Sequence, residues 1–223
     1  MITQVKKWVT EHPVWFAILF FIFYFTGFFT LEHLVTEPVY LLHCRLDDLI
    51  PFNEWFIFPY ASWFGLIPWA LITLLLFDRK NYFYLCGVMF SGMALCLLLY
   101  LIFPNGVDLR PQSIESSNLA AIFVRMIWSA DTSTNVCPSI HVASTFAIFL
   151  AVQRSRIWKH RKLVVGICGV LTIMICLSTL FLKQHSVIDV VCGIALSTAL
   201  HFVFRRTGER EQAVLCRLGE NEG

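Results

Sequence analysis

The chain has 223 residues, of which 57% are hydrophobic, and it carries a formal net charge of only +2. Its length allows one domain, and its mean hydropathy of +0.69 excludes an ordinary soluble protein and favours an integral membrane protein whose partner is the lipid bilayer. The small net charge gives no sign of binding to nucleic acid.

Six stretches approach the roughly 20 apolar residues that a helix needs to cross a bilayer. The sequence therefore predicts an all-α, polytopic membrane protein. It would be a six-transmembrane-helix bundle forming one domain over residues 1–204, followed by a charged tail at 205–223. The expected spans, of which the fourth is short, cover residues 14–35, 56–77, 83–103, 138–153, 163–182 and 186–204.

The basic residues predict the orientation of this bundle. If the chain starts in the cytoplasm, the only basic residues of the 17 that fall on the opposite side are Arg45, Arg110, Arg125 and Lys183. Segments rich in Lys and Arg stay on the cytoplasmic side of a membrane. We therefore expect both termini to be cytoplasmic, with the charged tail solvated there.

Two connections on the expected outer side are long. Residues 36–55 carry Asp47 and Asp48, which either touch a head group, bind a cation, or are solvated charges on an interfacial lid. Residues 104–137 are too many for a plain connector, and loops of this length usually serve a function. The middle of this connection, 119–128, is apolar enough to form a helix that lies flat on the membrane.

His185 and Asp189 stand at the beginning of the last apolar stretch. Four residues apart on a helix, they would share a face, and the carboxylate would accept the proton on one imidazole nitrogen. The other nitrogen would then present its lone pair as a nucleophile. An ionisable group facing lipid costs roughly 3 kcal/mol or more, so this pair predicts a polar cavity.

Two further segments are expected at the same surface. Pro138 suits the first position of a helix, where free backbone N–H groups, together with the Ser139 hydroxyl, make a cradle for an anion. His141, within the next turn, is placed to protonate a departing alkoxide. Arg110 offers a planar, charged fork that grips two phosphate oxygens. These are the parts that phosphoryl transfer requires.

The motifs resemble those of the type 2 phosphatidic acid phosphatase superfamily, whose pattern is K-x6-R-P, P-S-G-H and S-R-x5-H-x3-D. This chain has R-P at 110–111, P-S-I-H at 138–141 and S-T-L-F-L-K-Q-H-S-V-I-D at 178–189, so the resemblance covers about residues 100–200. It implies a metal-independent lipid phosphatase of the cell membrane, with six spans and an active site on the extracytoplasmic side.

The resemblance also implies a role for each matching residue. His185 would attack the phosphorus of a lipid phosphate or pyrophosphate to form a phosphohistidine, with Asp189 orienting it. His141 would protonate the leaving oxygen and then activate the acceptor. Arg110 and Ser139 would bind phosphate oxygens.

The chain departs from the family pattern at three positions. Phe103, Ile140 and Thr179 stand where the family has Lys, Gly and Arg, so that two phosphate-binding cations are missing. Lys183 and Arg125 are the candidate replacements. These departures favour an alternative, a head-group phosphotransferase similar to sphingomyelin synthase or inositol phosphorylceramide synthase, in which the acceptor is an alcohol on a second lipid.

Other interpretations remain open. Two histidines and a carboxylate also suit zinc or iron, but Arg110 would repel a cation, so no metal or cofactor is expected. A proton-coupled transporter would use His185 and Asp189 as a relay, although no pair of broken spans in repeated halves supports it. A non-catalytic relative would also lack the cations. The identity of the lipid and the oligomeric state are left open.

Overall fold

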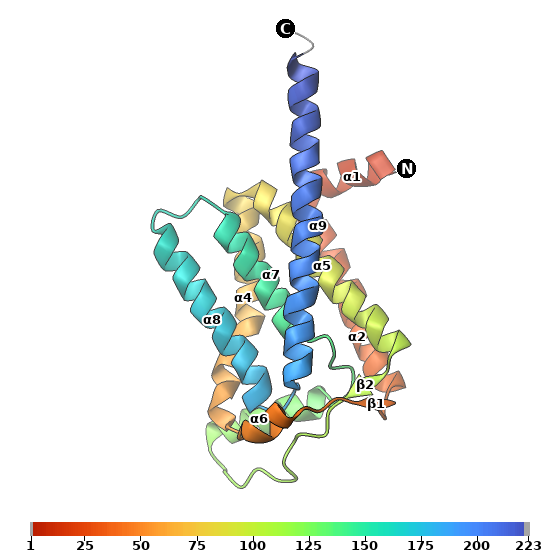
Figure 1. Ribbon diagram of the computed structural model, residues 1–223, viewed down its shortest axis with the longest axis vertical. Coiled ribbons are helices and arrows are strands. Elements are labelled where there is room, and N and C mark those ends of the chain that lie inside the picture. The colour runs from red at the N-terminus through yellow and green to blue at the C-terminus, as the bar shows by residue number, and fades with distance from the viewer. Residues whose placement is uncertain (1, 221–223) are drawn as a thin grey trace.

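The computed structural model describes the backbone of residues 2–220 and the side chains of residues 4–205. The described chain is mostly helical, as the sequence predicts (Figure 1). Its elements are α1 (Ile2–Glu11), α2 (Pro13–Leu34), β1 (Tyr40–Leu41), α3 (Arg45–Leu49), η1 (Glu54–Phe56), α4 (Ile57–Phe77), α5 (Arg79–Ile102), β2 (Asn105–Gly106), α6 (Leu119–Ala130), α7 (Ile140–Arg154), α8 (Arg161–Phe181) and α9 (Val187–Glu220).

Several helices begin where the sequence supplies a suitable first residue. α2 starts at Pro13, which loses nothing there because the first N–H groups of a helix have no partner within it. α5 follows Asp78, whose side chain accepts a hydrogen bond from the N–H of Asn81. α6 follows Asn118, which accepts one from Ala121 in the same way. Each of these helices begins within five residues of its predicted start.

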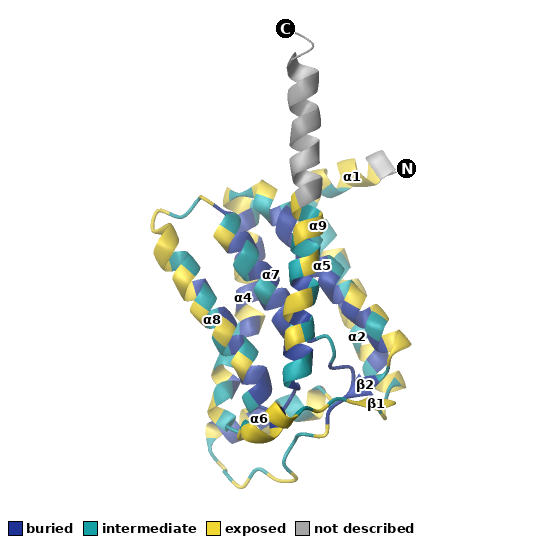
Figure 2. Ribbon diagram, viewed as in Figure 1, coloured by how far each residue is buried: buried dark blue, intermediate teal, exposed yellow. Residues whose placement is uncertain are grey.

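The helix α7 lies at the centre of the bundle. It packs against α4, α5, α8 and α9, whereas α2 lies on the outside and packs on α5 (Figure 1). Ala143, Ala147 and Ile148 of α7 are buried by these neighbours. The outer faces of the helices carry many exposed residues (Figure 2). Many of the large side chains exposed there are apolar, as expected of surfaces that contact lipid.

Within the described residues, five helical segments are long and apolar enough to cross a membrane: 13–34, 54–77, 79–102, 161–181 and 187–205. The fourth predicted span is present as α7, but its 15 residues extend for only about 22 Å. A bilayer core is about 30 Å thick, so α7 alone does not cross it. Its N-cap residue Ser139 and its first residue Ile140 are 0% and 4% exposed, so its N-terminus is buried in the protein.

One end of the bundle, which we refer to as the α6 end, is covered by the short elements α3, η1, α6, β1 and β2 (Figure 1). Strands β1 and β2 pair in parallel, which the all-α prediction did not include. They form where the two long connections run side by side. Gly106 allows this close approach, because a Cβ atom there would lie 2.8 Å from Cβ of Pro38 in the first connection.

The surface helix expected at 119–128 is α6, which crosses the end of the bundle at a steep angle to the long helices (Figure 1). Its inner face buries Ala120, Ala121 and Val124, and of these Ala120 and Val124 belong to one apolar cluster with Ile57 and Leu182. Its outer face exposes further apolar residues, Leu119, Ile122, Phe123 and Met126. The helix therefore lies flat over the bundle with apolar groups on both sides.

The charged tail predicted for 205–223 continues α9 as a helix to Glu220. The side chains from 206 onward and the backbone of 221–223 lie outside the described residues. The expectation of a solvated tail concerns these residues and is therefore not tested.

Candidate active site

His185 lies in the turn between α8 and α9 rather than on a helix. The carbonyl oxygen of Thr179 accepts hydrogen bonds from the backbone N–H groups of Gln184 and His185, at 3.0 and 3.2 Å. Lys183 takes a left-handed conformation with a φ of 57°. The sequence interpretation that His185 and Asp189 share one helix face therefore needs correction, since only Asp189 belongs to α9.

The first turn of α9 explains how the two groups still meet. The Asp189 carboxylate accepts a hydrogen bond of 2.8 Å from the backbone N–H of Ser186, and the Ser186 hydroxyl accepts one of 3.2 Å from the N–H of Ile188. Such reciprocal bonds across the start of a helix form a capping box, here S-V-I-D. They hold Oδ2 of Asp189 3.3 Å from Nδ1 of His185.

This arrangement selects the state of the imidazole. His185 and Asp189 are 7% and 0% exposed, so water competes little for their contact. A proton on Nδ1 directed at the carboxylate leaves the lone pair on Nε2. The carboxylate also stabilises the positive charge that the ring gains when Nε2 forms a bond.

His141 stands in the first turn of α7, and its ring centroid lies 5.9 Å from that of His185. Two aromatic rings of α4 pack against it, with centroid distances of 4.6 Å to Tyr60 and 4.4 Å to Trp63. The two histidines therefore face a common space, His141 from the first turn of α7 and His185 from the turn before α9.

A backbone hydrogen bond of 3.1 Å joins the two motifs directly, from the N–H of Ser139 to the carbonyl oxygen of Asp189. Gly193, one turn further along α9, permits this approach, because a Cβ atom there would lie 2.9 Å from the Ser139 carbonyl oxygen. The Ser139 hydroxyl caps its own helix by accepting a hydrogen bond of 3.4 Å from Val142. Ser139 thus begins α7, and Ile140 beside it lines the cavity described below.

Arg110 lies beside the histidine turn and is held by protein groups. Its guanidinium donates to the side chain of Gln184, the neighbour of His185, and to the carbonyl oxygens of Asp131 and Thr132 at 2.8 and 3.0 Å. It also lies over the ring of Trp128, 5.2 Å from the centroid. These contacts tie the end of α6 to the turn that carries His185.

The residues considered as sources of the missing cations lie elsewhere. Lys183 donates a hydrogen bond of 2.8 Å to the carbonyl oxygen of Asp47, and exposed Arg125 donates one of 3.1 Å to that of Ser116. Phe103 is 52% exposed at the end of α5, and the hydroxyl of Thr179 bonds back to its own helix. All four residues are described by the structure, and none of them lines the cavity described next.

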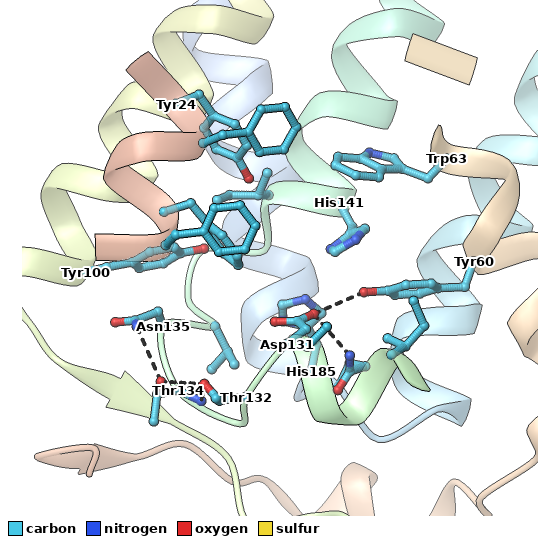
Figure 3. A pocket seen from close by; sticks show the side chains of 18 of the residues that line it. Tyr24, Tyr60, Trp63, Tyr100, Asp131, Thr132, Thr134, Asn135, His141 and His185 are labelled. Atoms are coloured by element: carbon cyan, nitrogen blue, oxygen red, sulfur yellow. Dashed lines mark hydrogen bonds between the residues drawn. The ribbon is translucent and has the colours of Figure 1, made fainter. Parts of the chain in front are cut away.

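The two histidine side chains line a cavity of about 170 Å³, which lies between α2, α4, α5 and the connection from α6 to α7 (Figure 3). Its wall is largely aromatic, and polar groups gather where His141, His185 and Asp131 converge (Figure 3). The aromatic side chains in the wall are Tyr24, Phe25, Phe28, Phe29, Tyr60, Trp63, Phe64 and Tyr100.

Asp131 is a site residue to which sequence reasoning gave no role. Its carboxylate accepts hydrogen bonds of 3.2 Å from the Tyr60 hydroxyl and 3.1 Å from the amide of Gln184. Burial raises the pKa of Asp131 to about 6, although His185 and Arg110 act in the opposite direction. The only sequence signal was an acidic residue shortly before P-S-I-H.

Asp47 is also better defined than the sequence allowed. It is 2% exposed, and its carboxylate accepts hydrogen bonds from the Ser186 hydroxyl and from the N–H groups of Val187 and Cys44, at 2.7, 2.8 and 2.8 Å. Burial acts to raise its pKa, but these hydrogen bonds outweigh burial and lower it. The carboxylate thus caps α9 and is neither a solvated charge nor a group directed at a ligand.

In the part of the chain that the structure describes, no three His, Cys, Asp or Glu side chains are grouped as a metal ion would require. A sequence model of the PAP2 superfamily matches residues 81–212, more than half of the chain. The match contains all three motifs and both histidines of the cavity. None of the curated proteins compared with the chain matches it significantly.

Proposed function

The chain belongs to the PAP2 superfamily, whose members are phosphatases or phosphotransferases, and on that premise we propose that it is a lipid phosphatase of the membrane. The observation that carries the proposal is the meeting of His185, paired with Asp189, and His141 at one cavity inside a bundle of apolar helices. The substrate is a lipid phosphate or pyrophosphate, because the cavity has a largely aromatic wall and lies within a bundle of apolar helices.

The first step forms a bond and breaks one. Nε2 of His185 attacks the phosphorus, the bond from phosphorus to the ester oxygen breaks, and His141 gives its proton to the leaving alkoxide. Asp189 retains the proton on Nδ1 and offsets the charge of the substituted ring. The products of this step are a lipid alcohol and a phosphohistidine.

The second step restores the enzyme. Neutral His141 takes a proton from a water molecule, the water oxygen attacks the phosphorus, and the bond from phosphorus to nitrogen breaks. Phosphate leaves, and both histidines return to their initial states. Both steps use side chains of this chain and one water molecule.

The orientation of the site follows from the positions of the charges. The histidines lie near the α6 end, while the basic connection at 154–162 lies at the opposite end (Figure 1). The positive-inside rule places the basic end in the cytoplasm. We therefore infer that the cavity opens towards the extracytoplasmic leaflet.

His185→Ala tests this proposal, with His43→Ala as the matched control, because exposed His43 also pairs with a carboxylate, that of Asp48, at 2.8 Å. Release of phosphate from dioleoyl phosphatidic acid in detergent micelles should fall at least about a thousandfold in His185→Ala and remain near wild type in His43→Ala. Turnover that survives in a well-expressed His185→Ala protein would overturn the assignment of the nucleophile.

One observation favours a second function, transfer of a head group to an alcohol. Asp131 brings a carboxylate to the cavity, and no Lys or Arg side chain is among the described residues that line it. A phosphomonoester carries nearly two negative charges at neutral pH, whereas a phosphodiester carries one. The charge around the histidines therefore suits a diester, which is the substrate of a transferase.

A single incubation separates the two functions. The purified protein is given a phosphodiester lipid labelled in its head group, together with a long-chain alcohol such as a diacylglycerol or a ceramide. Labelled phosphate or a labelled phosphorylated head group in the aqueous phase indicates hydrolysis. A new labelled lipid indicates transfer, and His185→Ala should abolish either product.

A further inference from the structure

An apolar groove runs along the outside of the bundle between α2 and α4. It has a volume of about 560 Å³, and Ile18 and Ile22 of α2 face Leu71 and Ile72 of α4 across it. Ile22 and Ile72 are each 58% exposed, so the groove opens towards the surrounding lipid. α2 packs mainly on α5, which leaves this side of α2 uncovered.

The groove adjoins the catalytic cavity. Phe25 lines both, and the next turn of α2 contributes Phe28 and Phe29 to the cavity. On α4, Trp63 and Phe64 line the cavity, and the groove begins at Pro68, about one turn later. The same two helices therefore form the walls of both spaces.

The chemistry of the groove defines what binds there. The polar side chains in its wall are Thr26 and Tyr82, and the Tyr82 hydroxyl already donates a hydrogen bond of 2.7 Å to the carbonyl oxygen of Pro13. From Val14 to Phe25 the helix α2 rises about 16 Å, which is roughly half the thickness of a bilayer core. A groove of this composition and length suits one hydrocarbon chain.

We propose that the hydrocarbon tail of the substrate lies in the groove between α2 and α4 while its phosphate group lies between the two histidines. This assignment rests on the proposed function for the identity of the ligand. It makes the pair α2 and α4 the path by which the lipid reaches the site from the bilayer.

A second groove, on the other side of α4, serves as the control. This apolar groove of about 410 Å³ lies between α4 and α8 and is lined by residues that include Trp69 and Ile167. It shares no described residue with the catalytic cavity. Ile167 is 60% exposed and so closely matches Ile72 in size and exposure.

The test compares Ile72→Trp with Ile167→Trp in full-length protein. Filling the groove between α2 and α4 should raise KM for dioleoyl phosphatidic acid about tenfold, because overpacking excludes the chain. Dihexanoyl phosphatidic acid, whose tails barely enter the groove, should be hydrolysed at the wild-type rate. Ile167→Trp should change neither the KM for dioleoyl phosphatidic acid nor the rate with dihexanoyl phosphatidic acid. Equal effects of the two substitutions would overturn the proposal.

A binding measurement decides the question without turnover. A phosphatidic acid with a photoactivatable group in its acyl chain is crosslinked to wild-type protein, and the labelled peptides are identified by mass spectrometry. Labels on 14–26 and 68–75 that unlabelled dioleoyl phosphatidic acid displaces support the proposal. Labels spread equally over 164–171 overturn it. Absence of turnover together with displaceable labels in the first groove would refute the proposed phosphatase and leave the binding site intact.

Discussion

The carboxylate of Asp47 accepts a hydrogen bond of 2.7 Å from the hydroxyl of Ser186, the residue that follows His185. Through this bond and the one from Val187, the loop segment that contains α3 holds the start of α9. The position of His185 therefore depends on a residue far away in the sequence. Asp47 is a positioning residue, because it touches the turn and not the cavity.

Asp47→Ala should lower both activity and stability. Removing the carboxylate leaves buried donors without a partner, which typically costs 1–3 kcal/mol and lets the turn with His185 move. We expect kcat to fall about a hundredfold with little change in KM, and Tm to fall by several degrees. Asp48→Ala, one residue away and exposed, is the control and should resemble wild type.

The same carboxylate makes stability depend on pH. Because hydrogen bonds lower the pKa of Asp47 below its ordinary value of 3.8, its contribution to stability is complete above that value. It is lost as the pH falls through the pKa of the folded protein. When thermal unfolding is measured between pH 3 and 6, the Tm of the wild-type protein should fall at the acid end. Asp47→Ala should lack this fall.

Asp189→Asn should reduce kcat by about ten thousandfold, as neutralising the orienting Asp of a serine protease triad does. The amide oxygen can still accept the hydrogen bond from Ser186, so the capping box should survive and Tm should change little. The measurement is single-turnover formation of labelled phosphoprotein. A loss smaller than tenfold would show that Asp189 only caps the helix.

Arg110→Lys should lower kcat, because an ammonium group cannot replace the planar fork that contacts Gln184 and two carbonyl oxygens together. Since Arg110 is held by protein groups, we expect competitive inhibition by inorganic phosphate to stay within about threefold of wild type, while kcat falls at least about tenfold. Arg125→Lys is the control. A large loss of phosphate inhibition in Arg110→Lys would instead make Arg110 a direct ligand of phosphate.

Asp131→Asn should change how KM depends on pH. Burial raises the pKa of Asp131 to about 6, so the side chain gains its charge as the pH rises through 6 and then repels an anionic phosphate. KM for dioleoyl phosphatidic acid should increase across this range in wild type and less in Asp131→Asn. Identical profiles would show that Asp131 does not face the bound phosphate.

Asp131 should also make stability depend on pH, in the direction opposite to that of Asp47. The pKa of folded Asp131 lies above the ordinary value of 3.8, so the folded protein binds the proton more tightly than the unfolded chain does. Stability should therefore fall as the pH rises from about 4 to about 6. Asp131→Asn should remove this part of the pH dependence of Tm.

The sequence predicted the long helices well, because an apolar stretch of the right length is a local feature. α4 was expected at 56–77 and occupies Ile57–Phe77, and α8 was expected at 163–182 and occupies Arg161–Phe181. The family and its motifs were also readable, since R-P, P-S-I-H and H-x3-D are short patterns in one chain.

The supporting contacts were not readable, because they join segments that are remote in sequence. Nothing in the sequence near Asp47 indicates that it caps α9, and the pKa of Asp131 is raised by burial, which only the folded chain provides. The turn at His185 was missed for a different reason. The spacing of four residues is compatible with a helix, and it also fits a turn followed by a capping box.

The rings of Tyr60 and Trp63 stand where bulk solvent would otherwise surround His141. A phosphorylated His185 would lie in the cavity that these rings line, so the access of water to it would depend on them. The fate of this intermediate is then a kinetic competition between hydrolysis and any hydroxyl compound that occupies the cavity. Substitutions in the aromatic wall should therefore alter product partitioning more than they alter the rate of the first step.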